Sequence, residues 1–599
     1  MYLPMYRRIY CIALIILILL SAGCVRQGRY IRVNQLGYRP GDIKVAVFLS
    51  KKPVTIRSFS LVDASTGKVA VRFSRAEQAA AYPPFESVYR LDFSLVQKPG
   101  SYYLEAGGAR SPVFRIAGNV YKGTADFLLR YLRQQQCGYN PLIRDSCHQY
   151  DGYIIYLPGR DSQHIDVRGG WHDASDYLQY VTTSATAVYQ LAFAYTLYPE
   201  AFSDAFNARG DSGSNGIPDV LDQVKWGLDW LDRMNPEPGI LFHQIADDRD
   251  HKGFRIPGND TFYNKGYERP VYFCSGMPQG IGKYKNRSTG RASIAGKFAS
   301  SFALGSVVLK KYYPEFSAKI LQKAKEAYTT GLKYPGVCQT APCRAPYFYE
   351  EENWADDMEL AASTLYQISG ERKYAEQAIA FGQKEGITGW MGRDTARHYQ
   401  YYPFVNLGHF LLTGMDSMAG CDTFRFLLKE SMERIVVRAV HDPFRMGIPF
   451  IWCSNNLLSA FITQCRLYER LTRDSSYRAY EAAARDWLFG CNPWGTSMIT
   501  GLPEGGDWPE DIHSALTHIG KYRVDGGLVD GTLEPWNLRT LELWQPGPFS
   551  LNPLRGRILG LDRHIYCPSS PKGKERKELP LVTYLSALHS KRNSLRFTL

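Results

Sequence analysis

The stretch GGWHDASD at residues 169–176 places two aspartates, Asp173 and Asp176, three positions apart behind two glycines, a tryptophan and a histidine. Carboxylates held close together can take protons from a reacting group. The same residues also suit the start of a helix, because Asp and Ser cap helix N-termini and acidic side chains interact favourably with the helix dipole. The stretch alone leaves both interpretations open.

A second set of side chains with metal-binding chemistry lies nearby in the sequence. It consists of Cys137, Cys147, the adjoining His148, and His172 within the opening stretch. Two thiolates and two imidazoles form the tetrahedral ligand set of a structural zinc ion. A disulfide between Cys137 and Cys147 is the alternative, since an exported chain can form one.

Two kinds of sequence pattern divide the chain into regions that must position these residues. Residues 30–117 alternate apolar and polar side chains in short segments between Pro/Gly turns, which predicts a small antiparallel β-sandwich of about seven strands. From about residue 120, apolar side chains recur at the helical spacing i, i+3, i+4 and i+7, with almost no strand signal. Long loops join these segments, which predicts a helical toroid with its functional loops at one face.

The N-terminus carries the pattern of an export signal over residues 1–24. Arg7 and Arg8 precede a short apolar run, CIALIILILL, and then Ala22-Gly23-Cys24. The last three residues resemble a bacterial lipobox, in which the cysteine is lipidated after cleavage. We therefore expect a lipoprotein anchored to a membrane through Cys24, in the periplasm or at the cell surface. Ordinary signal cleavage and an uncleaved anchor are the alternatives.

The composition is that of an ordered globular protein, with 14% aromatic and 22% charged residues among 599. The net charge of +13 could suggest an anionic partner. However, the basic residues are spread along the chain and no nucleic-acid-binding motif is visible. We expect no nucleic-acid partner, and we expect a monomer.

Several separate stretches together resemble glycoside hydrolase family 9. IRVNQLGY is similar to the start of the immunoglobulin-like domain that precedes many members, and GGWHDASD resembles the family motif GGW-[HY]-D-A-G-D, with Ser175 in place of the usual glycine. Further similar segments are NGIPDVLDQVKWGLDWL, DDMELAASTLY, FGCNPWGTSMITG and DGGLVDG. The resemblance implies an immunoglobulin-like β-sandwich at 30–117 followed by an all-α (α/α)6 barrel at about 120–590. It also implies cleavage of β-1,4-glucan with inversion.

This resemblance assigns roles to the two aspartates: Asp176 is the general base and Asp173 is its partner. An inverting glycosidase needs one carboxylate to activate a water and another carboxyl group to protonate the leaving oxygen, about 6.5–9.5 Å apart. Two aspartates three residues apart are too close in sequence to form that pair. They can instead share one water, which one of them deprotonates and the other orients.

The resemblance also implies two metal sites. Family members with an immunoglobulin-like module hold zinc in a Cys, Cys-His, His site, which Cys137, Cys147, His148 and His172 match; this zinc would be structural. Calcium is implied at Asp356 and Asp357, where oxygen ligands suit that ion. A solvated acidic helix start is the alternative for these two residues.

Substrate contacts follow from the resemblance and from residue type. His513 falls where the family has a histidine that contacts the sugar, although Ala515 stands where an arginine often follows. Four tryptophans in loop-like or helix-end stretches are candidates to stack on sugar rings, with a place in the core as the alternative: Trp171, Trp354, Trp452 and Trp494.

The general acid of the family has no counterpart that we can identify. The family places a glutamate in an Asn-Glu step before the last barrel helix, which LPLVTYLSAL resembles. Counting back from that segment leads to Lys572–Gly573, and the nearby Glu575 and Glu578 lie in a Lys/Arg-rich run that would lower a carboxyl pKa. Either the atypical segment 532–580 reflects compensating frameshifts, or the chain has lost its acid and binds glucan without cutting it.

We therefore expect an exported hydrolase of β-1,4-glucosidic bonds whose partner is a cellulose-like or mixed-linkage β-glucan, as polysaccharide or oligosaccharide. An exo-acting enzyme, or one specific for xyloglucan or an amino sugar, is a first alternative. A catalytically impaired glycan-binding surface lipoprotein is a second.

Overall fold

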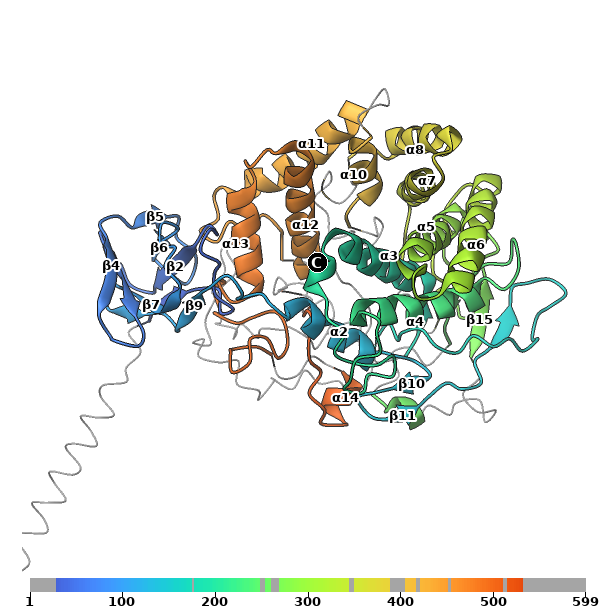
Figure 1. The fold of residues 1–599 in the computed structure, drawn as a ribbon, viewed down its shortest axis with the longest axis horizontal. Coiled ribbons are helices and arrows are strands. Elements are labelled where there is room, and N and C mark those ends of the chain that lie inside the picture. The colour runs from blue at the N-terminus through green and yellow to red at the C-terminus, as the bar shows by residue number, and fades with distance from the viewer. Residues whose placement is uncertain are drawn as a thin grey trace, which may run out of the picture.

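The computed structural model describes residues 28–174, 177–247, 254–259, 269–343, 349–387, 391, 404–415, 421–450, 454–509, 514–529 and 531. Figure 1 shows a β-sandwich at one side of a ring of helices. The predicted architecture of an immunoglobulin-like sandwich followed by a helical barrel is confirmed.

The sandwich consists of two antiparallel sheets with the strand orders β1-β2-β6-β5 and β4-β3-β7-β8, and β9 also pairs with β7. The bounds are β1 (Arg29–Arg32), β2 (Val45–Ser50), β3 (Phe59–Asp63), β4 (Val69–Phe73), β5 (Glu77–Ala79), β6 (Ser87–Asp92), β7 (Gly100–Ala106), β8 (Ala109–Arg110) and β9 (Phe114–Ile116). Phe48, Leu61 and Leu104 fill the space between the sheets. The sequence predicted about seven strands, because β5 and β8 are too short to show an alternation.

The sandwich is joined to the helices by direct hydrogen bonds. The Asn34 side-chain amide donates to Asp486 Oδ1 at 2.8 Å, and the Gln35 N–H donates to the Phe489 carbonyl at 2.8 Å. The β-domain therefore rests on the end of a barrel helix rather than on a bare linker.

The remaining described chain is mainly helical. The helices are α2 (Thr124–Gln134), α3 (Val181–Leu197), α4 (Asp219–Met234), α5 (Ala292–Leu309), α6 (Pro314–Lys333), α7 (Ala355–Ser369), α8 (Arg372–Glu385), α10 (Leu407–Thr413), α11 (Cys421–Ala439), α12 (Ser454–Thr472), α13 (Arg478–Leu488) and α14 (Ala515–His518), with 3-10 turns η1 (Pro199–Ala201) and η2 (Pro257–Asn259).

Inner and outer helices alternate along this part of the chain. α3, α5 and α7 are buried over most of their surface, and α5 packs on both of the others. α4 is also largely buried against α3, whereas α6 buries one stripe and exposes its other face. α5 is apolar and long enough to cross a membrane, yet 89% of it is buried within the protein, as expected of a core helix.

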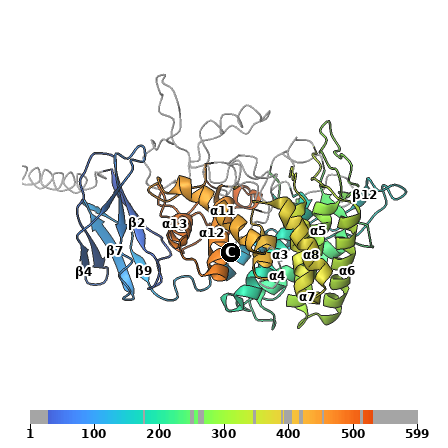
Figure 2. The same cartoon turned by 90° about the horizontal axis from the view of Figure 1, so that it is seen from above.

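The connections place the long loops at one face. Residues 310–313 join α5 to α6 and residues 370–371 join α7 to α8, so each outer helix runs antiparallel to the inner helix before it. Hydrogen bonds join the loops that lead into α3, α5 and α7 at one end of the ring: the Thr289 N–H donates to the Val337 carbonyl, and the Tyr349 hydroxyl donates to Asp173. Figure 2 shows the β-sandwich at one side of the helices and α6, α7 and α8 at the other.

A small sheet lies beside the start of α3, in a part of the chain whose sequence shows almost no strand signal. Its order is β12 (Tyr153–Ile155), β15 (Pro270–Phe273), β14 (Phe242–Ile245) and β13 (Gln179–Tyr180); β12 and β15 are parallel, and the other pairs are antiparallel. A separate hairpin pairs β10 (Tyr139–Asn140) with β11 (Asp145–Ser146). Strands of two to four mostly buried residues carry no alternation, so their sequence does not distinguish them from loop.

Candidate functional site

The described part of the GGWHDASD stretch, residues 169–174, belongs to a turn in front of α3 and does not start that helix. The Asp173 N–H donates to the Leu178 carbonyl at 2.7 Å, which closes the turn, and β13 follows before α3 begins at Val181. Asp173 lies eight residues before the first residue of α3, whose N-cap is Tyr180, so the helix-start interpretation does not hold for Asp173. Asp176 lies outside the described residues.

The Asp173 carboxylate is buried, with 4% of the residue exposed, and its orientation is fixed by two hydroxyl groups. The Tyr349 hydroxyl donates to Oδ1 at 3.1 Å and to Oδ2 at 3.0 Å. The Thr183 hydroxyl, in the first turn of α3, donates to Oδ1 at 3.2 Å. A carboxylate held in this way has a defined direction before any ligand arrives.

The backbone conformation and the packing explain why two glycines and a tryptophan precede His172. Gly169 and Gly170 adopt φ values of 104° and 71°, which favour glycine, and a Cβ on Gly170 would come within 2.7 Å of the Trp230 ring. Trp171 is fully buried, and its ring packs where Gly227 leaves room on α4. Trp171 therefore anchors the turn in the core and does not face a sugar.

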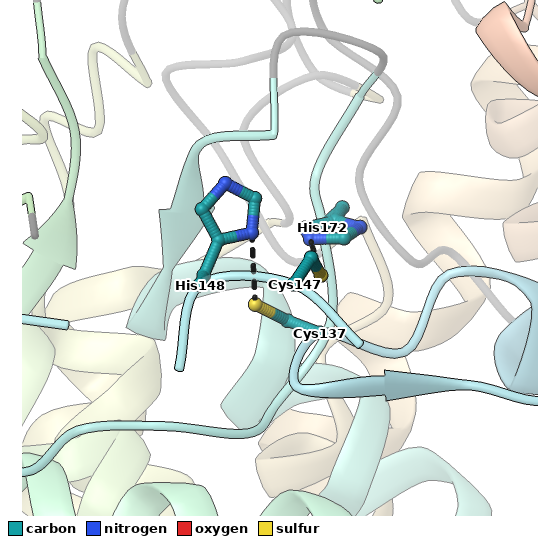
Figure 3. Close-up of side chains that lie close together, drawn as sticks. All are labelled: Cys137, Cys147, His148 and His172. Atoms are coloured by element: carbon teal, nitrogen blue, oxygen red, sulfur yellow. Dashed lines mark hydrogen bonds between the residues drawn. The ribbon is translucent and has the colours of Figure 1, made fainter. Parts of the chain in front are cut away.

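The four predicted zinc ligands lie together behind this turn, and all four are buried. Cys137 Sγ is 3.5 Å from His148 Nδ1, and Cys147 Sγ is 3.7 Å from His172 Nε2, as Figure 3 shows. Tetrahedral zinc with its usual bond lengths would hold sulfur and nitrogen ligands about 3.6 Å apart. All four ligand atoms lie within 4.8 Å of one another, so the cluster could bind zinc.

The electrostatics of the cluster also suit a cation. Burial raises the pKa of the Cys137 thiol to about 11, so a thiolate there needs a compensating positive charge. Burial lowers the pKa of His172, which favours the neutral imidazole that ligates metals. Cys137 and Cys147 are both free, so the disulfide alternative is not formed.

Backbone hydrogen bonds tie the cluster to the turn. The Cys137 N–H donates to the Gly170 carbonyl at 2.9 Å, and the His172 N–H donates to the Gln135 carbonyl at 2.8 Å. Since His172 directly precedes Asp173, a metal at the cluster would hold the turn from behind.

The acidic pair at the start of α7 has a different environment from the one that calcium requires. Asp356 and Asp357 are buried rather than solvated, and Lys297 of α5 places its Nζ 2.6 Å from Asp357 Oδ2 and 2.5 Å from Glu351 Oε1. Burial alone would lower the pKa of Lys297, but the two carboxyls raise it above its ordinary value, so the side chain remains an ammonium. This ammonium would repel a divalent ion at the same place, and the residues do not fit calcium.

One positive charge facing two carboxyl groups leaves part of the negative charge unbalanced. Burial raises the pKa of Glu351 to about 7, with Lys297 opposing that shift, and burial also raises the pKa of Asp357. Both carboxyl groups are therefore harder to ionise than exposed ones.

The other predicted sugar-contact residues are distributed unevenly. Trp494 is buried against Trp487, with ring centroids 5.8 Å apart, so it belongs to the core. Trp354 is half-buried at the N-terminus of α7, with Phe381 at its edge, and its contact with sugar stays a prediction. Trp452, His513 and Cys24 lie outside the described residues.

Three residues beside the turn were not found from the sequence. Tyr349 and Thr183 hold Asp173, and Arg269 donates to the Tyr177 carbonyl from directly before β15. Tyr349 directly precedes three glutamates and Thr183 follows another threonine, and neither residue type marks a site by itself. A lone arginine ahead of a short apolar strand, in RPVYF, is the one signal that could have marked a buried charge.

Comparison with known families gives two matches. Glycosyl hydrolase family 9 matches residues 121–541, and the cellulase N-terminal ig-like domain matches residues 26–111. Residues after 541, which include most of the atypical segment, lie beyond the first match.

Individual proteins agree with these families. A cellodextrinase of Butyrivibrio fibrisolvens is 26% identical over 494 residues, covering 79% of this chain and 84% of the relative. A xyloglucan-specific endo-β-1,4-glucanase of Bacteroides ovatus is 26% identical over 524 residues, covering 81% and 82%. The crystal structure of a metagenome-derived glycoside hydrolase family 9 endoglucanase superposes with a TM-score of 0.70 at 27% identity, covering 85% of this chain and 91% of that one.

Proposed function

Because the chain belongs to glycosyl hydrolase family 9, a family of β-1,4-glucanases with an (α/α)6 barrel, we propose that it hydrolyses β-1,4-glucosidic bonds in cellulose-like or mixed-linkage β-glucans with inversion. The observation that carries this proposal is the Asp173 carboxylate, buried and aimed by Tyr349 and Thr183 in the turn that also contains Asp176. The turn lies at the end of the ring where the long loops gather.

In this mechanism Asp176 takes a proton from a water, and the water oxygen attacks the anomeric carbon from the face opposite the leaving oxygen. Asp173 accepts a hydrogen bond from the other O–H of the same water and so fixes the orientation of the water. Because Tyr349 and Thr183 already hold Asp173, little reorganisation is needed when the sugar binds. The leaving oxygen needs a proton from a carboxyl group, and we assign no residue to that step.

The test is release of reducing sugar from soluble mixed-linkage β-glucan by the full chain, beside Asp176→Ala and Asp173→Ala. We expect release by the parent and a loss of about 10²–10⁴-fold in Asp176→Ala, the usual worth of a general base. Release that persists unchanged in both variants would place the chemistry elsewhere and overturn the proposal.

The substrate within this class is open to direct comparison. The two curated relatives are named for cellodextrins and for xyloglucan, which supports testing short oligosaccharides and decorated polymers side by side. An endo-acting enzyme would lower the viscosity of mixed-linkage glucan early in the reaction. An exo-acting enzyme would release sugar with little change in viscosity, and preference for xyloglucan or for an amino sugar would appear as a higher kcat/KM.

A glycan-binding lipoprotein with an impaired site is the second candidate function. The missing counterpart of the family's acid supports it, since a sugar alkoxide leaves slowly without a proton. Retarded migration in a glucan-containing gel without any sugar release would favour this function. The DNA of segment 532–580 would then be read in its other frames for a Tyr-Asp-Asn-Glu loop, which the frameshift hypothesis requires.

We also propose that the Cys137, Cys147, His148 and His172 cluster holds a structural zinc ion. Four protein ligands would leave no open position, so the metal would brace the turn and take no part in the reaction. Metal analysis of purified protein should give one zinc per chain, and His148→Ala should lose it. Purified parent protein that contains no zinc would contradict this proposal.

The same proposal extends to export and anchoring through Cys24, which the N-terminal sequence motivates. Lipidated protein should partition with membranes, whereas Cys24→Ala should not incorporate labelled fatty acid. Incorporation in both would show that the lipid is attached elsewhere.

A further inference from the structure

Arg269 is a fully buried cation that the proposed mechanism does not use. It directly precedes β15, in the small sheet that ends beside the Asp173 turn, and its side chain has 0% exposure. Its charge is balanced by Asp151, which is 1% exposed: Arg269 Nη2 lies 2.7 Å from Asp151 Oδ2, and Nε lies 3.1 Å from the same oxygen.

The remaining donors of Arg269 reach three other segments. Nη1 donates to the Tyr177 carbonyl, and Nη2 donates to Gln179 Oε1 at 2.8 Å. Nη2 also lies 3.8 Å from Cys137 Sγ. One guanidinium thus contacts the turn, the strand that follows the turn, and the Cys/His cluster.

These contacts hold a part of the backbone that would not keep its shape by itself. Tyr177 has a φ of 66°, in the left-handed region that a side chain with a Cβ rarely adopts. Such a conformation persists only where the surroundings enforce it. Arg269 does so at the Tyr177 carbonyl, and the Tyr177 hydroxyl donates to the Arg255 carbonyl.

Arginine suits this place better than lysine does. Its planar fork carries five N–H donors in fixed directions and remains charged when buried, whereas an ammonium is a point charge on a flexible stem. Asp151 alone could neutralise either cation, so neutralisation does not explain the contacts to Tyr177 and Gln179.

We propose that Arg269 is a positioning residue for the turn that carries Asp173 and Asp176, and that it locks this turn to the Cys/His cluster. This inference rests on the proposed function. Without the guanidinium, the turn relaxes and the water held between the two aspartates loses its alignment with the anomeric carbon. A misplacement of about 1 Å costs about 10²-fold in rate.

The test uses Arg269→Lys, which keeps a charge for Asp151 but removes the fork, beside Arg160→Lys in the exposed pair with Glu237 as a matched control. Hydrogen–deuterium exchange of the peptide spanning residues 170–180 is the first readout, because it needs no activity. We expect faster exchange there in Arg269→Lys and no change in Arg160→Lys. Should Arg269→Lys fail to fold, Gln179→Ala removes one contact and leaves the ion pair intact.

Kinetics on mixed-linkage glucan is the second readout. We expect kcat to fall by about 10²-fold with KM little changed and with the metal content of the parent retained. Unchanged exchange in the turn of Arg269→Lys would overturn the inference. If the parent is active, a kcat of Arg269→Lys equal to that of the parent would also overturn it, and so would a loss of rate that follows a loss of metal. An inactive parent with faster exchange in Arg269→Lys would reject the proposed function and leave the positioning role standing.

Discussion

Two buried cations lie near the candidate site, and they do different work. Arg269 is paired with Asp151 and spreads its other donors over backbone and side chains of the turn. Lys297 lies between Glu351 and Asp357 and donates to both carboxylates. Arg269 fixes the conformation of the turn through directed hydrogen bonds. Lys297 supplies positive charge beside Asp357, where the family resemblance implied calcium.

The two regions meet at one short stretch of chain. Tyr349, which holds Asp173, is two residues from Glu351, which contacts Lys297. The turn is thus held from the side of the small sheet by Arg269 and from the side of α7 by Tyr349. We therefore expect that disrupting either ion-pair group, Arg269 with Asp151 or Lys297 with its two carboxyls, disturbs Asp173. The effect on stability should be larger for the Arg269 pair.

The largest effect is expected from Asp151→Ala, which leaves Arg269 buried without its counter-ion. Removing one partner of a buried pair costs about 3–5 kcal/mol in the free energy of unfolding. Urea unfolding measures it, and Asp166→Ala, in the exposed pair with Arg168, should cost no more than about 1 kcal/mol. Equal losses in the two variants would break the comparison.

Lys297→Met should come next, and its cost should depend on pH. Burial already gives Glu351 and Asp357 a raised pKa in the folded protein, and removing the ammonium raises both further. A raised carboxyl pKa means that stability is lost as pH rises through it. We expect a loss of about 3 kcal/mol above pH 7 and a much smaller loss near pH 5.

The control for that variant is Lys319→Met, whose side chain is 54% exposed and whose partner Asp232 keeps a second ion pair with Lys323. Its cost should be small at every pH. A Lys297→Met cost that grows as pH falls would contradict the assigned sign.

Tyr349→Phe should lower both stability and rate. It removes hydrogen bonds to a buried carboxylate, worth about 1.5 kcal/mol or more in the free energy of unfolding, and the less well held Asp173 should lower kcat by about tenfold. Tyr328→Phe, which removes a hydroxyl bonded to Gln377 away from the turn, should leave kcat unchanged. A kcat in Tyr349→Phe equal to that of the parent would mean that Asp173 needs no such support.

The smallest effect is expected from calcium. With Lys297 between the carboxyls, the melting temperature should be the same in millimolar calcium and in a calcium chelator. A melting temperature that rises with calcium in the parent would show that a divalent ion binds despite the ammonium.

The sequence predicted the large features because they are periodic. The sandwich follows from alternation, and α3, α5 and α7 follow from apolar side chains at helical spacing. The small sheet did not follow, since two to four mostly buried residues have no period. A loop-like sequence also does not show whether a side chain is buried or exposed. Trp171 and Trp494 were therefore predicted to contact sugar, although both lie in the core.

The residues of the candidate site were predictable where they lie together in a short motif. They were not predictable where their partners are distant in the sequence. Asp173, His172 and the cysteines are recognisable by type and motif. Arg269 is not, because its partners Asp151, Tyr177 and Gln179 lie 90 to 118 residues away along the chain. Their meeting depends on the pairing of β15 with β12 and β14, which the sequence did not reveal.

The most direct test of the account is the anomeric configuration of the first product, followed by proton NMR while the full chain acts on a cello-oligosaccharide or mixed-linkage glucan. A water activated at the Asp173 turn attacks opposite the leaving oxygen, so the α-anomer should appear first and then mutarotate. A product that appears first as the β-anomer, or substrate that binds and is never cut, would contradict it.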